Sequence, residues 1–531
     1  MTTPAPGVYR TQNWVIHKPA ARGHGGIVVS QNREAAEAGA AILAAGGNAA
    51  DAAVATAFAL AAVEPWNSGL GGIGFALVLK AGESQAQVVD FGPVAPRRAN
   101  PADYPLTGNM KRDLFTWPEV VGDRNIHGPL SFCIPSAVAG YGKLKEAFGS
   151  KLPFVLLLAP AIALARLGLA QDWYTTLKVA SSASVLKLYD ESARLYLPGG
   201  LPPVPPYQGN PGFMVLGNLA DTLARIAKAG TDDFYRGDLA RRLAADIAKL
   251  GGVVDEEDLG NCRAVVRAAP AIDWRGRYKL FTAGGLTAAP TLEAVVTGMD
   301  AHVPGASGAD AAWFAQLSRM MRKAYADRLE GLGAASAARE PGDTCTTHLT
   351  VVDAEGTLVS MTTTLLSSMG SRVVLPDTGV LMNNGIMWFD PRPGTANALQ
   401  PGARPLCNMC PVIAMPTSGT GARYAAGSSG GRRILASVYQ MLAWTLDAGM
   451  DVETAAHMPR IDVSGPDDTT ADCRLPADTI AALQAAGPVT IAEHAVVPIN
   501  FACPNIIKVD ASGAEAVSDV VSPWSAAVAA G

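Results

Sequence analysis

The clearest apolar pattern near the start of the chain is a pair of alanine-rich helical segments. Residues 34–45 carry small apolar side chains at helical spacing, and Gly46-Gly47 ends this segment. Asn48 suits the N-cap of a second helix that runs through Val63, because its side chain can accept a hydrogen bond from a free backbone N–H group. Side chains as small as alanine let helix axes approach closely, so the pattern predicts a tightly packed helical layer.

Strand signals follow this pair of helices. Residues 69–75 are glycine-rich and predict a tight turn into a strand at residues 75–80, and a second strand is expected at residues 85–91. The glycine-rich stretch lacks the Lys-Ser/Thr pair that follows the glycines of a phosphate-binding loop. A turn is therefore a better interpretation than a nucleotide site.

The most apolar stretch, residues 152–165, contains Pro160 and stops at Arg166. It is shorter than the ~18 residues that a membrane-spanning helix needs, so we expect a packed helix and no membrane partner. Residues 197–213 are rich in proline and glycine and predict a long surface loop. Residues 434–448 predict a helix.

The longest β-branched pattern is a hairpin between Cys345 and Thr364. Two runs rich in valine and threonine flank Ala354-Glu355-Gly356, which predicts a three-residue loop with its glycine in the left-handed conformation. If the residues on either side of this loop pair with each other, the antiparallel register brings Thr346 opposite Thr364. Threonine is also a good strand former, so the residues of the hairpin alone favour a purely structural role.

Composition narrows the class of function. The chain has 531 residues, of which 49% are hydrophobic and 17% charged, as in a globular protein with a large core. A net charge of −5 gives no basic face for nucleic acid. Seven cysteines are too few for a disulfide scaffold, so we expect reduced thiols. Residues 1–19 show no charged segment followed by an apolar run, which predicts no signal peptide and a cytoplasmic location.

One cysteine pair has the spacing of a metal or redox site. Cys407-Asn408-Met409-Cys410 is a CxxC sequence, but no second cysteine pair and no nearby histidine accompany it. The sequence therefore implies no metal and no organic cofactor.

The start of the hairpin carries a family resemblance. Thr346-Thr347-His348 resembles the start of the small subunit in the gamma-glutamyltransferase family of N-terminal nucleophile hydrolases. Other stretches resemble signatures of this family in the same order along the chain. They are residues 46–53, 69–72, 90–91, 135–140, 234–237 and 325–328. The resemblance implies an α+β fold, the four-layer αββα sandwich of this superfamily.

The resemblance also implies a self-cleaved precursor. In this family the new N-terminal threonine supplies its hydroxyl as nucleophile and its α-amine, with a pKa of roughly 7.7–8.0, as general base. The cleaved bond would join Cys345 and Thr346. A large chain of residues 1–345 and a small chain of residues 346–531 would then fold together as one intertwined domain. Residues 331–343 form a small-residue linker, shorter than is usual in the family, that could present this bond.

Further catalytic roles are implied by the same resemblance. Thr364 resembles the family's second threonine, which hydrogen-bonds the nucleophile. Gly430 and Gly431 resemble the oxyanion-hole segment, although a glycine pair before a helix is also an ordinary helix entry. His348 resembles a histidine that the family also carries, and we treat it as structural.

The positions that hold the glutamate head in the family are changed here. Members that act on gamma-glutamyl compounds use an Arg, an Asn, a Gln, an Asp and a Ser-Ser pair for the α-amino and α-carboxylate groups. At these positions this sequence has Gly92, Leu366, Gly385, Trp388, Cys407 and Asn408. The substrate acyl group is therefore expected to lack the glutamate zwitterion, and the additional Arg432 leaves room for one carboxylate.

These observations predict an autoprocessed amidohydrolase or acylase that forms an acyl-enzyme on Thr346. Its substrate would be a small-molecule amide, and the acceptor would be water or an amine. One alternative is a true gamma-glutamyl hydrolase or transpeptidase. Its clamp, meaning the side chains that hold the α-amino and α-carboxylate groups of glutamate, would then be rebuilt from Arg97, Arg98 or Arg432. Another is a non-catalytic scaffold that keeps the fold, although retention of Thr346 and Thr364 argues against it.

Overall fold

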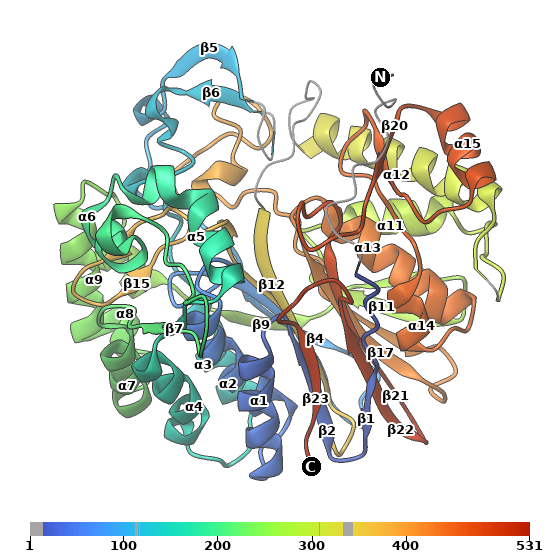
Figure 1. Ribbon diagram of the computed structural model, residues 1–531, viewed down its shortest axis with the longest axis horizontal. Coiled ribbons are helices and arrows are strands. Elements are labelled where there is room, and N and C mark those ends of the chain that lie inside the picture. Colours follow the sequence, from blue (N-terminus) through green and yellow to red (C-terminus); the bar gives the residue numbers. More distant parts are fainter. Residues whose placement is uncertain (1–13, 112–114, 116, 307, 333–343) are drawn as a thin grey trace.

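The computed structural model describes residues 14–111, 115, 117–306, 308–332 and 344–531. Within these residues, two seven-stranded antiparallel sheets form the centre of the protein (Figure 1). In spatial order, the strands of the first sheet are β23 (Ala526–Ala529), β2 (Gly26–Ser30), β12 (Thr344–Asp353), β13 (Leu358–Ser367), β3 (Ile73–Leu79), β4 (Gln87–Phe91) and β9 (Val265–Ala268). Those of the second sheet are β1 (Ala21–Gly23), β22 (Gly513–Ser518), β21 (Cys503–Asp510), β17 (Arg423–Ser429), β16 (Val412–Pro416), β11 (Tyr278–Thr282) and β10 (Ala271–Trp274).

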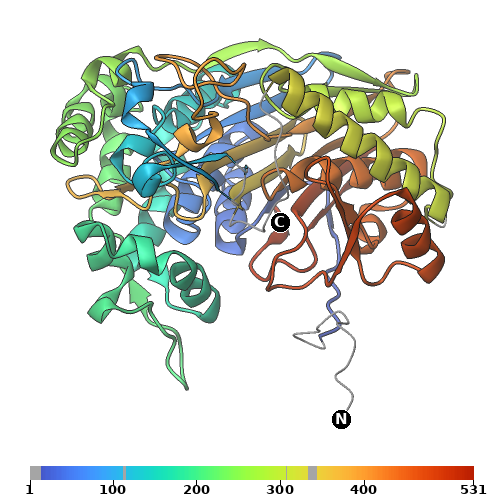
Figure 2. The same cartoon turned by 90° about the horizontal axis from the view of Figure 1, so that it is seen from above.

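Helices cover the outer face of each sheet, and the inner faces pack on each other (Figures 1 and 2). The first sheet contacts α1 (Arg33–Ala44), α2 (Ala49–Val63) and α3 (Ala137–Phe148). The second contacts α13 (Arg433–Leu442) and α14 (Val452–His457). Between the sheets, β12 and β13 lie against β17. The expected four-layer αββα sandwich is therefore confirmed.

The other elements surround this sandwich. The remaining helices are α4 (Phe154–Leu167), α5 (Trp173–Leu186), α6 (Asp190–Tyr196), α7 (Leu219–Ala229), α8 (Asp233–Arg236), α9 (Asp238–Lys249), α10 (Glu256–Asn261), α11 (Ala289–Gly298), α12 (Ala311–Leu332) and α15 (Ala477–Ala486). The short strands are β5 (Leu106–Met110), β6 (Pro118–Val120), β7 (Leu169–Ala170), β8 (Phe213–Met214), β14 (Val374–Leu375), β15 (Val380–Leu381), β18 (Ile461–Asp462), β19 (Thr469–Asp472) and β20 (Val489–Ala492).

The alanine-rich helices form as the sequence predicts. Asn48 caps α2 through a reciprocal pair of hydrogen bonds with Asp51, at 3.1 and 3.2 Å. Gly39 of α1 lies against α2 so closely that a Cβ atom there would be 2.2 Å from Thr56 Oγ1. Small side chains are therefore what lets these two helices pack as a tight layer over the first sheet.

Several element boundaries differ from expectation by one or two residues, as in β4, which begins at Gln87 and not at residue 85. One of these differences has a clear tertiary reason. β3 begins at Ile73, two residues early, because Ile73 and Gly74 pair with β13. Gly74 has no room for a side chain, since a Cβ atom there would lie 2.3 Å from Thr362 O. The helix expected at residues 434–448 is α13 followed by a π-helical turn, η6 (Ala443–Asp447).

The apolar run and the loops are as predicted where they can be seen. The run forms α4, with Pro160 inside it. Among the described residues, none of the helices combines the length and the apolar character needed to cross a bilayer. Residues 197–212 contain one 3-10 turn, η4 (Pro198–Gly200), and are otherwise irregular, and Phe213 begins β8. Most of the linker at residues 331–343 lies outside the described residues.

Candidate active site

The hairpin of β12 and β13 has the register that its loop chemistry predicts. Gly356 has a φ of 86°, in the left-handed region. The Asp353 N–H donates to Thr357 O at 3.2 Å, and the ladder continues until Thr347 lies opposite Thr363. The predicted register is confirmed up to this pair.

A β-bulge at the end of the ladder brings two threonine hydroxyls together. Between the pairs Cys345–Leu366 and Thr347–Thr363, β12 has one residue, Thr346, whereas β13 has two, so the extra residue of the bulge lies on β13. Its Oγ1 lies 3.1 Å from Thr364 Oγ1. Both side chains are buried. The two threonines that the sequence placed opposite each other are therefore in direct contact.

Both hydroxyls also contact the carbonyl group that precedes Thr346. Cys345 O accepts hydrogen bonds from Thr346 Oγ1 at 2.8 Å and from Thr364 Oγ1 at 2.7 Å. The Leu366 N–H donates to Thr364 Oγ1 at 2.8 Å, which directs the Thr364 proton toward the Cys345 and Thr346 oxygens. A carbonyl held by such donors is polarised toward nucleophilic attack.

Leu366 has a backbone conformation that leucine rarely adopts. Its φ is 89°, whereas asparagine and glycine are the residues that tolerate positive φ. Strain of this kind persists only when the surrounding structure enforces it, and it often accompanies functional sites. Here it holds the Leu366 N–H against Thr364.

The glycine pair connects β17 to α13. Gly430 and Gly431 have φ values of 134° and 61°, which other residues seldom adopt. Within the described part of the chain, neither glycine N–H has a hydrogen-bond acceptor. Gly431 lines the same small cavity as Thr346. Two free N–H groups beside a hydroxyl nucleophile are the elements of an oxyanion hole, so that role stays our prediction for both glycines.

Replacing Gly430 by alanine tests this prediction. A Cβ atom at Gly430 would lie 3.0 Å from Ala502 and would occur at a φ that L-residues avoid, so the N–H groups should move. If they hold the oxyanion, turnover should fall on the order of 10²–10³. Gly419→Ala is the matched control, since Gly419 also has a positive φ but nothing lies within 4 Å of its Cβ position. A processed Gly430→Ala enzyme with normal kcat would place the oxyanion hole elsewhere.

Two small cavities adjoin Thr346. The first, of about 10 Å³, is lined by Thr346, Leu366, Trp388, Asn408 and Gly431, together with Phe115, Met409 and Ile434. The second, of about 20 Å³, shares Phe115, Trp388 and Asn408 with it and extends to Arg328 and Arg432. Such volumes hold little more than a water molecule. A substrate therefore requires these side chains, or the segment before Thr346, to move.

Three of the predicted substrate-contact positions lie outside these cavities. A Cβ atom at Gly92 would be 2.4 Å from the guanidinium of Arg404, and one at Gly385 would be 2.6 Å from Cys133 Sγ. Cys407 is fully buried. The structure thus brings Leu366, Trp388, Asn408 and Arg432 to the region of Thr346, but not these three.

Arg97 and Arg98 are engaged elsewhere. Arg97 forms ion pairs with Asp255 at 3.2 Å and Glu257 at 2.8 Å, and Arg98 lies 3.8 Å from Asp255. These contacts are at the start of α10 on the surface. The hypothesis that Arg97 or Arg98 rebuilds a carboxylate clamp is therefore wrong for this structure.

Arg328 is a candidate site residue that sequence reasoning missed. It is 6% exposed and donates to Thr287 O at 2.8 Å and Cys407 O at 2.6 Å. Burial lowers its pKa, and no Asp or Glu of the described residues is among the charged groups that act on it. Its only signal in the sequence was its place in the stretch 325–328. Together with Arg432 it places two guanidinium groups in the lining of the second cavity.

His348 has a structural environment. It is fully buried, and its Nδ1 lies 2.8 Å from Thr362 Oγ1. Gly427 of the facing sheet leaves room for the ring, because a Cβ atom there would lie 2.1 Å from it. Burial lowers the pKa of His348 to about 3, so the ring is neutral near pH 7.

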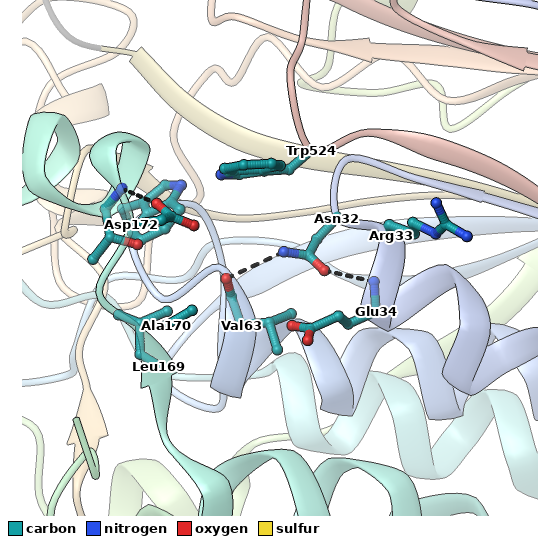
Figure 3. A pocket seen from close by; sticks show the side chains of 10 residues that line it. Asn32, Arg33, Glu34, Val63, Leu169, Ala170, Asp172 and Trp524 are labelled. Carbon is teal, nitrogen blue, oxygen red and sulfur yellow. Dashed lines mark hydrogen bonds between the residues drawn. The ribbon is translucent and has the colours of Figure 1, made fainter. Parts of the chain in front are cut away.

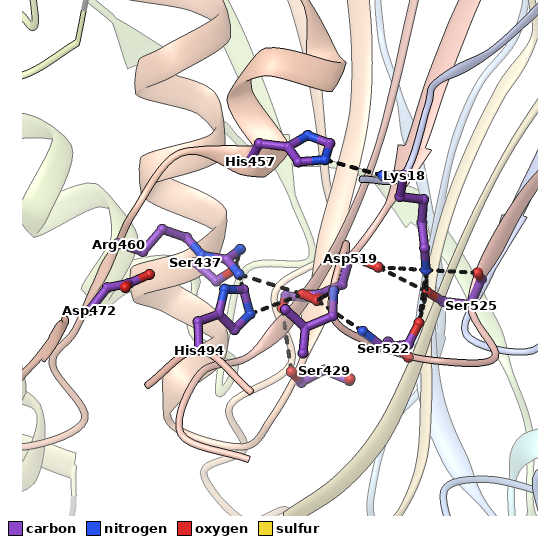
Figure 4. Close-up of polar contacts among 12 residues, drawn as sticks. Lys18, Ser429, Ser437, His457, Arg460, Asp472, His494, Asp519, Ser522 and Ser525 are labelled. Carbon is purple, nitrogen blue, oxygen red and sulfur yellow. Dashed lines mark hydrogen bonds and ion pairs between the residues drawn. The ribbon is translucent and has the colours of Figure 1, made fainter. Parts of the chain in front are cut away.

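A buried cluster of charged and polar side chains contacts α13 (Figure 4). Arg460 Nη2 lies 3.1 Å from His494 Nε2 and 3.5 Å from Asp519 Oδ2, and its Nη1 lies 3.5 Å from Ser437 of α13. Lys18 Nζ donates to the Asp519 carbonyl at 2.8 Å. The helix that follows the glycine pair is thus tied to the segment before β1.

An αββα sandwich with a threonine near the start of a central strand defines the class of N-terminal nucleophile hydrolases. The family described as gamma-glutamyltranspeptidase matches residues 35–341 and 333–529. The glutathione hydrolase proenzyme of Escherichia coli is 30% identical, with 91% of this chain and 89% of that protein covered. The chain therefore belongs to the gamma-glutamyltranspeptidase family and is an enzyme.

Two further relatives are acylases. The Acylase ACY 1 proenzyme of a Pseudomonas species is 31% identical, with 88% of this chain and 87% of that protein covered. The crystal structure of cephalosporin acylase from Bacillus halodurans matches with a TM-score of 0.81 over 99% of each chain. At 24% identity, that match shows the shared fold.

Proposed function

We propose that the enzyme is an autoprocessed amidohydrolase whose nucleophile is Thr346. The observation that carries this proposal is the contact of the Thr346 and Thr364 hydroxyls with Cys345 O, at 2.8 and 2.7 Å. A nucleophile already held against the carbonyl group that it attacks needs little reorganisation before reaction.

In self-cleavage, Thr346 Oγ1 attacks the Cys345 carbonyl carbon, and the hydroxyl proton passes to the Thr346 nitrogen. The C–N bond breaks as an ester forms, and water then hydrolyses this ester. The products are residues 1–345 and residues 346–531. Because each sheet contains strands from both parts, hydrogen-bonded to one another, the two chains stay associated.

In the mature enzyme, the free α-amine of Thr346 removes the proton of its own hydroxyl. The hydroxyl oxygen attacks the substrate amide and forms an acyl-enzyme, while Gly430 and Gly431 stabilise the oxyanion. Thr364 orients the nucleophile. Water, or an amine acceptor, releases the acyl group.

The surroundings of Thr346 favour one class of acyl group. Leu366 and Trp388 offer apolar surface where gamma-glutamyl enzymes hold an ammonium group. Beyond them, Arg328 and Arg432 line the adjoining cavity and can bind a carboxylate. We therefore favour the monoamide of a dicarboxylic acid without an α-amino group.

The rival function is gamma-glutamyl hydrolysis or transfer. A glutathione hydrolase and an acylase are nearly equally identical to this chain in sequence, so sequence identity does not decide between the two functions. Arg328 and Arg432 could hold an α-carboxylate. Among the described residues that line the two cavities, however, none is acidic, and an α-ammonium group would lack a charged partner.

Mass spectrometry of the enzyme during turnover tests the proposal. With glutaryl p-nitroanilide as substrate, we expect two chains, release of nitroaniline, and a glutaryl group on the peptide that begins with Thr346. Iodoacetamide-treated enzyme is the control, since it blocks accessible thiols and should leave the acylation of Thr346 unchanged. Turnover with an acyl group on any other residue would contradict the proposal.

A further inference from the structure

Glu64 is a buried carboxylic acid beside the start of β12, and none of the steps above involves it. It is the C-cap of α2 and is 4% exposed. Burial disfavours its charged form, and so does the negative end of the helix dipole. An ionisable group kept in such an unfavourable place is a candidate for a functional role.

Glu64 belongs to a chain of buried hydrogen bonds. Thr347 Oγ1 donates to Glu64 Oε2 at 2.9 Å, and Asn67 Nδ2 donates to Glu64 Oε1 at 2.6 Å. Asn67 Nδ2 also lies 3.2 Å from Gln31 Oε1, and Gln31 Nε2 donates to Ser429 Oγ. All five side chains are buried.

The two ends of this chain adjoin the two halves of the candidate active site. Thr347 directly follows the proposed nucleophile, Thr346, and Ser429 directly precedes Gly430. A change at Glu64 can therefore alter both the start of β12 and the loop that contains Gly430 and Gly431.

The charge of Glu64 changes near neutral pH. Burial raises its pKa to about 7, whereas the hydrogen bond from Thr347, the charge of Lys178 and the hydrogen bond from Asn67 lower it. A cavity of about 240 Å³ lies against the same end of α2, lined by Val63 and Trp66 on either side of Glu64 (Figure 3). It has room for several water molecules, which lets protons exchange with this region.

Other titratable groups face the same region. Lys178 and Tyr174 come from α5, and Cys345 and Cys503 come from β12 and β21. Burial raises the pKa of Tyr174 and of Cys503 to about 12, so both are neutral near pH 7.

We propose that Glu64 is a positioning residue for self-cleavage, an inference that rests on the function proposed above. Through Thr347, Glu64 fixes the backbone that follows the nucleophile. As a carboxylate, it also favours the proton that the Thr346 nitrogen must gain before it leaves as an amine. A negative charge one residue away acts strongly there, because buried surroundings screen it weakly. Neutral Glu64 keeps its hydrogen bonds but loses this effect.

Glu64→Gln removes the negative charge of this side chain and keeps its size and shape. Pulse labelling in cell-free translation monitors self-cleavage of the newly made chain. Above neutral pH, the cleavage rate of this variant should be roughly tenfold to a hundredfold lower than that of the wild type. Thr347→Val, which removes the donor, should slow it in the same direction. Thr363→Val is the matched control, because Thr363 lies opposite Thr347 and is equally buried but contacts Tyr141 instead, at 3.0 Å. Its rate should equal that of the wild type.

The pH dependence gives a second readout. In the wild type, the cleavage rate should fall as the pH drops through about 7, where Glu64 gains its proton. The Glu64→Gln rate should be flat across the same range. The Thr346 nitrogen does not interfere, because it is an amide before cleavage and does not titrate.

Stability distinguishes positioning from simple structural support. The pKa of Glu64 is raised from its usual 4.5, so its contribution to folding is full below about 4.5 and is lost as the pH rises through about 7. Glu64→Gln should therefore unfold at the same or a higher temperature than the wild type above pH 7. A variant that cleaves slowly but is less stable there would make the role structural and overturn the inference.

The remaining outcomes separate this inference from the proposed function. If Glu64→Gln cleaves at the wild-type rate with the wild-type pH profile, and Thr346→Ala stays uncleaved, the inference is wrong and the proposed function stands. If Thr346→Ala is also cleaved, the proposed function fails first.

Discussion

Thr346→Ala should remain one uncleaved chain with no amidase activity. The substitution removes the Thr346 hydroxyl, which donates to Cys345 O at 2.8 Å. The methyl side chain of alanine can neither form the ester nor carry an acyl group. A denaturing gel should show one band for this variant and two for the wild type.

A matched variant shows whether Thr346→Ala loses activity because the nucleophile is missing or because the fold is disturbed. Thr347→Ser keeps a hydroxyl beside the same bond and next to Glu64, and it should still be cleaved. Thermal unfolding of Thr346→Ala should stay close to that of the wild type, since the side chain removed is small and its hydroxyl has two hydrogen-bond partners among the described residues, Cys345 O and Thr364 Oγ1. Two bands from Thr346→Ala would sink the assignment of the nucleophile.

Gamma-glutamyl compounds, glutathione included, should be poor substrates. A hydrogen bond to a charged group contributes roughly 1.5–3 kcal/mol, so the loss of three or four such contacts lowers kcat/KM by several orders of magnitude. Leu366 and Trp388 cannot replace the lost partners, and desolvating an unpaired ammonium group is itself expensive. The positive charges of Arg328 and Arg432 oppose that group further.

The deciding comparison is kcat/KM for gamma-glutamyl p-nitroanilide against glutaryl p-nitroanilide, which lacks only the α-amino group. Leu366→Asn should narrow the difference, because asparagine accepts the positive φ of this position and offers an amide oxygen to the ammonium group. Leu366→Gly relieves the same strain without the amide and serves as its control. If the wild type prefers the gamma-glutamyl compound by about tenfold or more, the argument from the changed clamp is wrong and the rival function holds.

Local chemistry explains what the sequence alone could predict. The loop around Gly356 fixes the hairpin register, and the register determines that Thr346 and Thr364, 18 positions apart in the chain, lie close together. Asn48 and the alanine pattern likewise define α2 without knowledge of the sheets. Contact between Thr346 and Thr364 was predictable for this reason. The bulge on β13 opposite Thr346 was not, because it adjoins a leucine with positive φ, Leu366, which local sequence does not predict.

The parts that could not be predicted depend on contacts between distant segments. Arg328 reaches the site only because α12 packs beside the segment at Cys407. Gly92 was assigned to the substrate by its place in a motif, yet Arg404 occupies the space beside it. Glu64 carried no signal, since a carboxylate at a helix end is usually solvated. Only the fold shows that α2 delivers it to Thr347.

Each sheet contains strands from both sides of the proposed cut, and this affects how the mature protein unfolds and refolds. In the first sheet, β23, β12 and β13 come from one side of the proposed cut, whereas β2, β3, β4 and β9 come from the other. Neither product has a complete sheet of its own. Dilution therefore does not dissociate the two folded chains, and they separate only when they unfold. Before the cut, refolding is a reaction within one molecule. After it, refolding requires two molecules to meet, and its rate becomes concentration-dependent. Maturation would thus exchange a chain that can renature alone for one whose lifetime is set by its unfolding barrier.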